Sequence, residues 1–144
     1  MKQFYKSKSL LRLSFLFAVL FSVVSVMHSC KDDKEDEFTD HLVKFESKIV
    51  NGTGSGTGTF KTVVTQVGTS QNTIFDPTGT TWSSGDIFVN SSQSQLNLAA
   101  NAVLPNADSK LIVTIWVDSE VAKSDTVTGS GTKNAAVAYS FLEL

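Results

Sequence analysis

The sequence has little of the chemistry that disulfides, metal sites and many active sites require. Its 144 residues include one cysteine and two histidines. A single cysteine excludes an intrachain disulfide. His28 lies in an N-terminal segment that we expect to be removed, so only His41 remains. Cys/His zinc sites and multi-histidine sites are therefore excluded, and we expect no bound metal.

Positive charge is scarce beyond the N-terminus. The formal net charge is −2, yet the first twelve residues contain basic side chains and no acidic one: Lys2, Lys6, Lys8 and Arg12. The rest of the chain is therefore acidic. Nucleic-acid interfaces need a clustered basic face, so we expect no nucleic-acid partner.

Motifs for nucleophilic and phosphate chemistry are also absent. No G-x-S-x-G sequence occurs, and the glycine-rich residues 51–59 lack the lysine of a P-loop. Ser-His-Asp catalysis would have to use His41, which follows Asp40. The alternative is that His41 is an ordinary surface residue, and we favour this alternative. We expect no enzyme activity, no catalytic residue and no cofactor.

Residues 1–29 have the three parts of a secretion signal. The basic start is followed by the apolar residues 13–24 and by Ser29, a small residue before Cys30. The alternative is an uncleaved membrane helix, because residues 10–27 approach the roughly 18 apolar residues that span a bilayer. Serines interrupt this run, so we predict a cleaved signal peptide.

The end of this segment, Met-His-Ser-Cys at residues 27–30, resembles a bacterial lipobox. The resemblance covers the leader only. It implies that the chain is cut before Cys30 and that Cys30 is acylated. Several acyl chains would anchor the protein stably, since each buried methylene contributes roughly 0.8 kcal/mol.

Residues 30–37 continue as an acidic segment that cannot bury itself and would act as a solvated tether. Lys31, Asp32 and Asp33 resemble the export signal of certain Gram-negative surface lipoproteins. That resemblance implies an outer-membrane lipoprotein facing the cell exterior. The alternative location is the periplasmic leaflet.

Alternating apolar and polar residues dominate residues 38–144, which we assign to one domain. In residues 41–49 and 110–118 the alternation is typical of half-buried strands. Further strands are predicted at 60–67, 72–75, 80–90, 96–100, 121–124 and 135–141. No segment has helical spacing, which excludes parallel α/β architecture. We predict an all-β fold, an antiparallel β-sandwich of about seven or eight strands, with a flexible loop at residues 51–59 and a tight turn at 118–120.

A second resemblance covers most of this domain. It rests on His-Leu-Val-Lys-Phe-Glu at residues 41–46, on Trp82 after a Gly-Thr-Thr turn, and on Ile-Trp-Val-Asp at residues 115–118. Together these resemble the MmpS-type transport-accessory family. The resemblance implies an immunoglobulin-like sandwich behind a membrane anchor and, as an alternative function, an accessory subunit of an envelope transporter.

One stripe of side chains is a candidate binding surface. Ile112, Thr114 and Trp116 alternate with the predicted core residues of their strand, so they should face outward and could stack on a sugar or contact a protein. The alternative is that a loop covers them and Trp116 belongs to a small satellite core. Trp82, beside a turn, is expected to be a core residue.

Two weaker motifs concern modification and metal binding. Residues 125–127, Asp-Thr-Val, resemble an O-glycan acceptor of the same Gram-negative group, which would make Thr126 the modified residue. The alternative is an ordinary strand end. Oxygen ligands for calcium could come from Asp76, Asp86, Asp118 and Glu120, but no calcium-loop pattern supports such a site. The sequence thus predicts a lipid-anchored, non-catalytic domain that binds a protein, a glycan or an envelope component.

Overall fold

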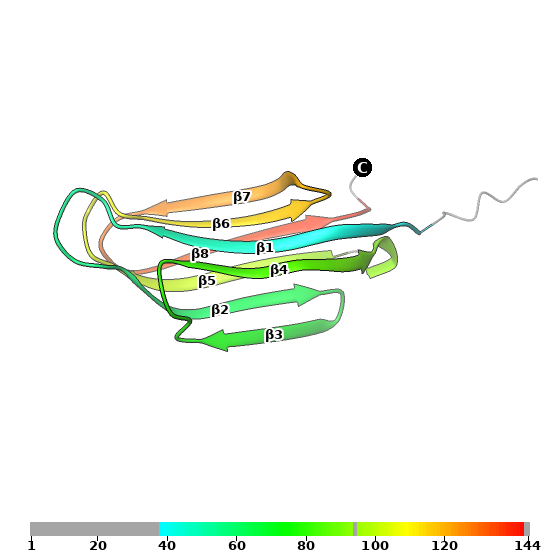
Figure 1. Cartoon of the computed structure of the whole chain (residues 1–144), viewed down its shortest axis with the longest axis horizontal. Helices are drawn as coiled ribbons and strands as arrows, with labels where there is room; N and C mark the ends of the chain where they lie inside the picture. The colour runs from blue at the N-terminus through cyan, green and yellow to red at the C-terminus, as the bar shows by residue number, and fades with distance from the viewer. Residues whose placement is uncertain (1–37, 94, 143–144) are drawn as a thin grey trace, which may run out of the picture. The chain divides into compact units, whose positions relative to one another are not determined.

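The computed structural model describes residues 38–93 and 95–142, which form eight β-strands and one short 3₁₀ turn (Figure 1). The strands are β1 (Asp40–Val50), β2 (Thr59–Val67), β3 (Ser70–Phe75), β4 (Thr81–Asn90), β5 (Gln95–Leu104), β6 (Lys110–Val117), β7 (Glu120–Thr128) and β8 (Gly131–Ser140), and the 3₁₀ turn is η1 (Ser91–Gln93).

These strands form two four-stranded antiparallel sheets. The first sheet has the order β4-β1-β6-β7 and the second has the order β3-β2-β5-β8. Inward-facing side chains of both sheets belong to one hydrophobic core. The predicted all-β sandwich and its number of strands are therefore confirmed.

The core follows from the period of two in each strand. In β1, Val43, Phe45, Ser47 and Ile49 are buried while Lys44, Glu46 and Lys48 are more exposed, as the alternation predicts. In β6, Leu111, Val113 and Ile115 are completely buried. Complete burial of a side chain of this size contributes about 1.5–3 kcal/mol. The other core residues are Phe60, Val63, Val89, Leu96, Leu98, Ala100, Ala102, Leu104, Ala135 and Phe141.

The hairpin between β6 and β7 turns on two residues with positive φ. Asp118 has φ 51° and Ser119 has φ 70°, the backbone signs of a type I′ turn, whose twist matches that of antiparallel strands. Asparagine and aspartate tolerate this region, whereas serine is less favourable there. The predicted turn at residues 118–120 is therefore present.

The glycine-rich loop between β1 and β2 is tied to the β5–β6 turn. The backbone N–H and the hydroxyl of Thr53 both donate to Asp108 Oδ2, at 2.8 and 2.7 Å. These bonds stabilise the carboxylate and lower the pKa of Asp108. Ser109 Oγ and Asn106 Nδ2 both donate to the carbonyl of Asn51. The expected flexible loop thus has specific tertiary partners some 55 residues away in the sequence.

The chain enters and leaves the sandwich at the same end. β1 starts where β8 ends, and the loop after β1 lies at the opposite end beside the β5–β6 turn (Figure 1). We call the end at which β1 starts and β8 ends the entry end. No helix among residues 38–93 and 95–142 is long and apolar enough to cross a membrane. The predicted signal peptide at 1–29 and the tether at 30–37 lie outside the described residues.

Candidate functional site

A cleft opens between the two sheets at the side where β3 and β4 are the outermost strands. Its volume is about 440 Å³, within the range of small-ligand sites. β3 and β4 follow each other in the chain but belong to different sheets, so no backbone ladder closes this side. The lining residues are Phe45, Thr65, Val67, Ser70, Gln71, Asn72, Trp82, Ser83, Ser84 and Ile87.

The walls of the cleft combine aromatic and uncharged polar groups. Trp82 is half-buried and packs against the core. The register places Asn72 of β3 opposite the buried Thr65 of β2. None of the lining residues carries an ionisable side chain. Such a cleft suits a neutral ligand with one apolar face and several hydroxyl groups.

A β-bulge shapes the β4 wall. The register of β1 and β4 shifts between Lys44 and Glu46, and Gly85 adopts φ 71° in the bulged segment. Ser84 Oγ accepts the N–H of Phe45 at 3.0 Å and donates to the carbonyl of Gly85. Bulges redirect side chains at sheet edges. Here the bulge places Ser83 and Ser84 beside Trp82 along the cleft.

The predicted binding stripe lies on the outer face of the first sheet. Ile112 and Trp116 are half-buried there, whereas Thr114 is buried and its hydroxyl lies 3.1 Å from Ser124 Oγ. Lys44 Nζ lies 4.6 Å from the centroid of the Trp116 ring, which is cation–π distance. The indole Nε1 is buried without a hydrogen-bond partner. The three side chains thus share a face, but they do not form a continuous exposed stripe.

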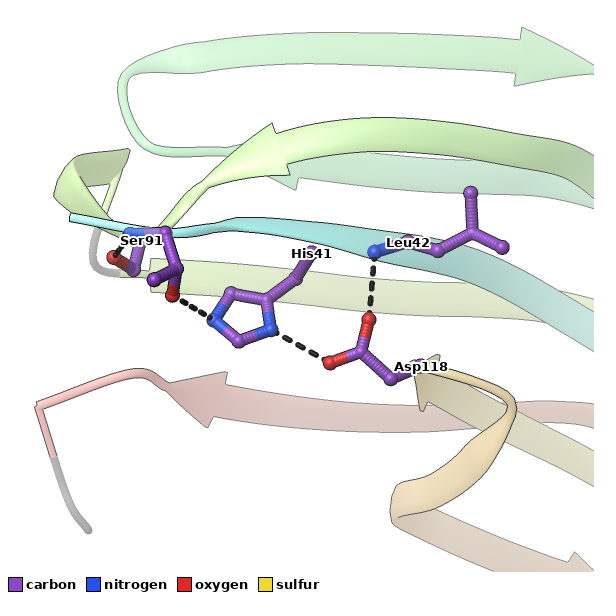
Figure 2. Close-up of polar contacts among 5 residues, drawn as sticks. His41, Leu42, Ser91 and Asp118 are labelled. Atoms are coloured by element: carbon purple, nitrogen blue, oxygen red, sulfur yellow. Dashed lines mark hydrogen bonds and ion pairs between the residues drawn. The ribbon is translucent and has the colours of Figure 1, made fainter.

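His41 belongs to a second polar cluster, at the entry end (Figure 2). Its Nδ1 lies 2.7 Å from Asp118 Oδ2, and its Nε2 lies 3.0 Å from Thr39 Oγ1. Asp118 Oδ1 accepts the N–H of Leu42. The imidazole stacks on Phe141 with 4.8 Å between ring centroids. The partner of His41 is therefore Asp118, and its sequence neighbour Asp40 instead accepts a hydrogen bond from Asn90.

The order hydroxyl, imidazole, carboxylate in this cluster is that of a catalytic triad, but its hydrogen bonds hold structural elements together. Thr39 N donates to Ser91 Oγ, and Ser91 N donates to the Thr39 carbonyl. The backbone N–H groups of Thr39 and Ser91 are therefore not free to bind an oxyanion. The hydrogen bonds from His41 and Leu42 lower the pKa of Asp118. The cluster joins the start of β1 to the β6–β7 turn and to η1.

The remaining predicted residues are dispersed. Thr126 is exposed on the edge strand β7, opposite Ile112. Asp76 Oδ1 lies 3.8 Å from Lys61 Nζ. Asp76 is therefore paired with a lysine and does not belong to the Asp118 cluster. Among residues 38–93 and 95–142, no group of three His, Cys, Asp or Glu side chains is placed to hold a metal. Cys30, Lys31, Asp32 and Asp33 lie outside the described residues.

Sequence reasoning did not find the cleft. No sequence motif marks Thr65, Ser70 or Asn72, and the sequence predicts Trp82 as a core residue. Only the assignment of β3 and β4 to different sheets brings these side chains together. The uncharged composition of residues 70–75 was the one available signal.

Comparisons with known proteins found no matching family model, no matching curated protein and no matching solved structure.

Proposed function

We propose that the chain is an outer-membrane lipoprotein, anchored through acylated Cys30 and facing the cell exterior, whose sandwich is a non-catalytic domain that binds a neutral glycan. The observation that carries the binding function is the cleft between β3 and β4, with Trp82 in one wall and uncharged polar side chains around it. The lipobox-like residues 27–30 and the acidic tether support the location.

The composition of the cleft favours a sugar over other ligand classes. The apolar face of a pyranose can pack on an aromatic ring such as Trp82, while its hydroxyl groups exchange hydrogen bonds with amide and hydroxyl side chains. Asn72, Gln71 and Ser70 offer such groups on β3. A phosphorylated or acidic ligand would find no cationic side chain among the lining residues.

Titration of the mature protein with neutral oligosaccharides, selected on a glycan array, tests this function. Asn72→Ala should weaken binding about 5- to 10-fold, the equivalent of one hydrogen bond of roughly 1–1.4 kcal/mol. Thr73→Ala is the matched control, because Thr73 is also exposed on β3 but does not line the cleft. An array without any bound neutral glycan, or equal losses in the two variants, would contradict the proposal.

A further inference from the structure

Large apolar side chains are exposed around the entry end. Phe38 is 58% exposed, Phe88 82%, Val121 52% and Leu142 75%. Soluble domains do expose single apolar residues, but a group at one end of a domain indicates a contact surface. We call these four residues the entry rim.

Hydrogen bonds and strand register place the entry rim near one end of the first sheet, with Phe88 on the edge strand β4 and Val121 on the other edge strand, β7. Phe88 is the register partner of Leu42. Leu42 in turn exchanges hydrogen bonds with Asp118, through the Asp118 N–H and the Asp118 carboxylate. Val121 follows Asp118 in the same hairpin, opposite Trp116.

The two ends of the described domain complete the rim. Phe38 lies two residues before the start of β1, and Leu142 follows Phe141, whose ring stacks on His41. Figure 2 shows His41, Leu42 and Asp118 meeting at this point. In Figure 1 the start of β1, the end of β4, the β6–β7 turn and the end of β8 all lie at one end of the sandwich.

The length of the tether limits how far this end can be from the anchor. Residues 31–37 separate Cys30 from Phe38. A chain extends at most about 3.3–3.6 Å per residue, so the eight steps from Cys30 to Phe38 span no more than roughly 29 Å. With Cys30 fixed at a lipid surface, this span would keep Phe38, and with it the entry end, within reach of that surface.

We propose that the entry rim rests on the lipid bilayer and that its apolar side chains insert into the interface. This inference rests on the proposed lipid anchor and not on the glycan site. The same end carries Asp40, Asp118 and Glu120, so anionic lipids would not attract it. The contact is therefore apolar and insensitive to salt, whereas an electrostatic contact would weaken on screening. It would fix the orientation of the sandwich and hold the β1–β2 loop away from the membrane.

Spin labels at two exposed phenylalanines test the orientation. Phe88→Cys places a label on the entry rim, and Phe75→Cys places one at the other end of the sandwich, where Phe75 is 73% exposed. Acylation blocks Cys30, so each variant of the lipidated protein has one free thiol. The protein is reconstituted in phosphatidylcholine vesicles. The relaxation of each label by oxygen, which partitions into lipid, is compared with its relaxation by a water-soluble nickel complex.

The label at position 88 should be relaxed several-fold more by oxygen than by the nickel complex, and the label at position 75 should show the reverse. Raising the salt concentration should change neither ratio. Equal access of the nickel complex to both labels on vesicle-bound protein would overturn the orientation and leave the anchor intact. Protein that does not float with the vesicles, or that also labels at Cys30, would overturn the anchor and this inference with it. Neither result bears on glycan binding.

Discussion

His41 Nδ1 and Asp118 Oδ2 lie 2.7 Å apart although 77 residues separate them in the chain. The same aspartate accepts the N–H of Leu42 through its other oxygen. One carboxylate in the β6–β7 turn therefore fixes both the side chain and the backbone of the first strand. The pair thus ties the start of β1 to the β6–β7 turn, beside the strand pairing of β1 with β6.

Acid stability should depend on Asp118. Its pKa is lowered in the folded protein by the hydrogen bonds from His41 and Leu42. The unfolded chain, with an aspartate pKa of about 3.9, therefore binds more protons in acid. The stabilisation is fully present above that pH and is lost as the pH falls through the folded pKa. Asp118→Asn should flatten the acid limb of a stability–pH curve and cost less than about 1 kcal/mol at pH 7, because the side chain is solvent-exposed.

Urea titrations of both proteins between neutral and acidic pH measure this effect. Asp125→Asn serves as the control, because Asp125 belongs to the same hairpin but its carboxylate accepts the N–H of the next residue, Thr126, and does not bond to β1. An unchanged acid limb in Asp118→Asn would contradict the role assigned to the pair.

A substitution at Ser119 in the β6–β7 turn should stabilise the folded protein. This residue has φ 70°, a region in which a side chain costs roughly 1–2 kcal/mol and glycine costs little. Ser119→Gly should raise the free energy of unfolding by about 0.5–1 kcal/mol. Thermal unfolding checks the change. Ser119→Ala keeps a Cβ at the same position, so a comparable gain in that variant would show that φ is not the cause.

The ordering of the β1–β2 loop should depend on Asp108. Asp108→Ala removes the acceptor of both Thr53 hydrogen bonds, so the Thr53 amide should exchange with deuterium faster at neutral pH. Amides in the centre of β5 should be unaffected. Ala107→Ser alters the neighbouring exposed residue and provides the control. Equal protection of Thr53 in wild type and Asp108→Ala would refute this assignment.

Trp116 should contribute to packing and not to ligand binding. Trp116→Phe keeps an aromatic ring under Lys44 and removes the buried indole N–H that has no partner. An unpaired buried donor costs about 1–3 kcal/mol, which offsets the loss of apolar contacts, so stability should change by less than about 1 kcal/mol. Glycan affinity should be unchanged. A loss of affinity in this variant would instead favour a ligand on the Ile112–Thr114–Trp116 face.

Anchoring should require Cys30. Cys30→Ser should move the protein from the membrane fraction to the soluble fraction and abolish the mass added by acylation. Protease added to intact cells should digest the wild-type domain if it faces the exterior. Complete protection with retained acylation would place the protein on the periplasmic leaflet.

Local patterns were sufficient to predict the strands but not their partners. The alternation around Phe45 and Ile115 depends only on neighbouring residues, and both side chains are buried as predicted. The bond between Thr53 and Asp108 crosses 55 residues, and nothing near either residue specifies the other. The cleft could not be predicted from local patterns either, because Trp82 and Asn72 meet only through the way in which β3 and β4 are placed in different sheets. The resemblance to MmpS-type domains stays a prediction.

The order in which the chain visits the two sheets has a consequence for the proposed export of the protein. β1 pairs with β4 and β6, and β5 pairs with both β2 and the final strand, β8. Neither sheet can be completed by the first half of the chain, and contacts of such long sequence separation form slowly. A chain that emerges from the ribosome in this order cannot complete either sheet until β7 and β8 have been synthesised. That delay is compatible with passage through a narrow secretion channel before folding.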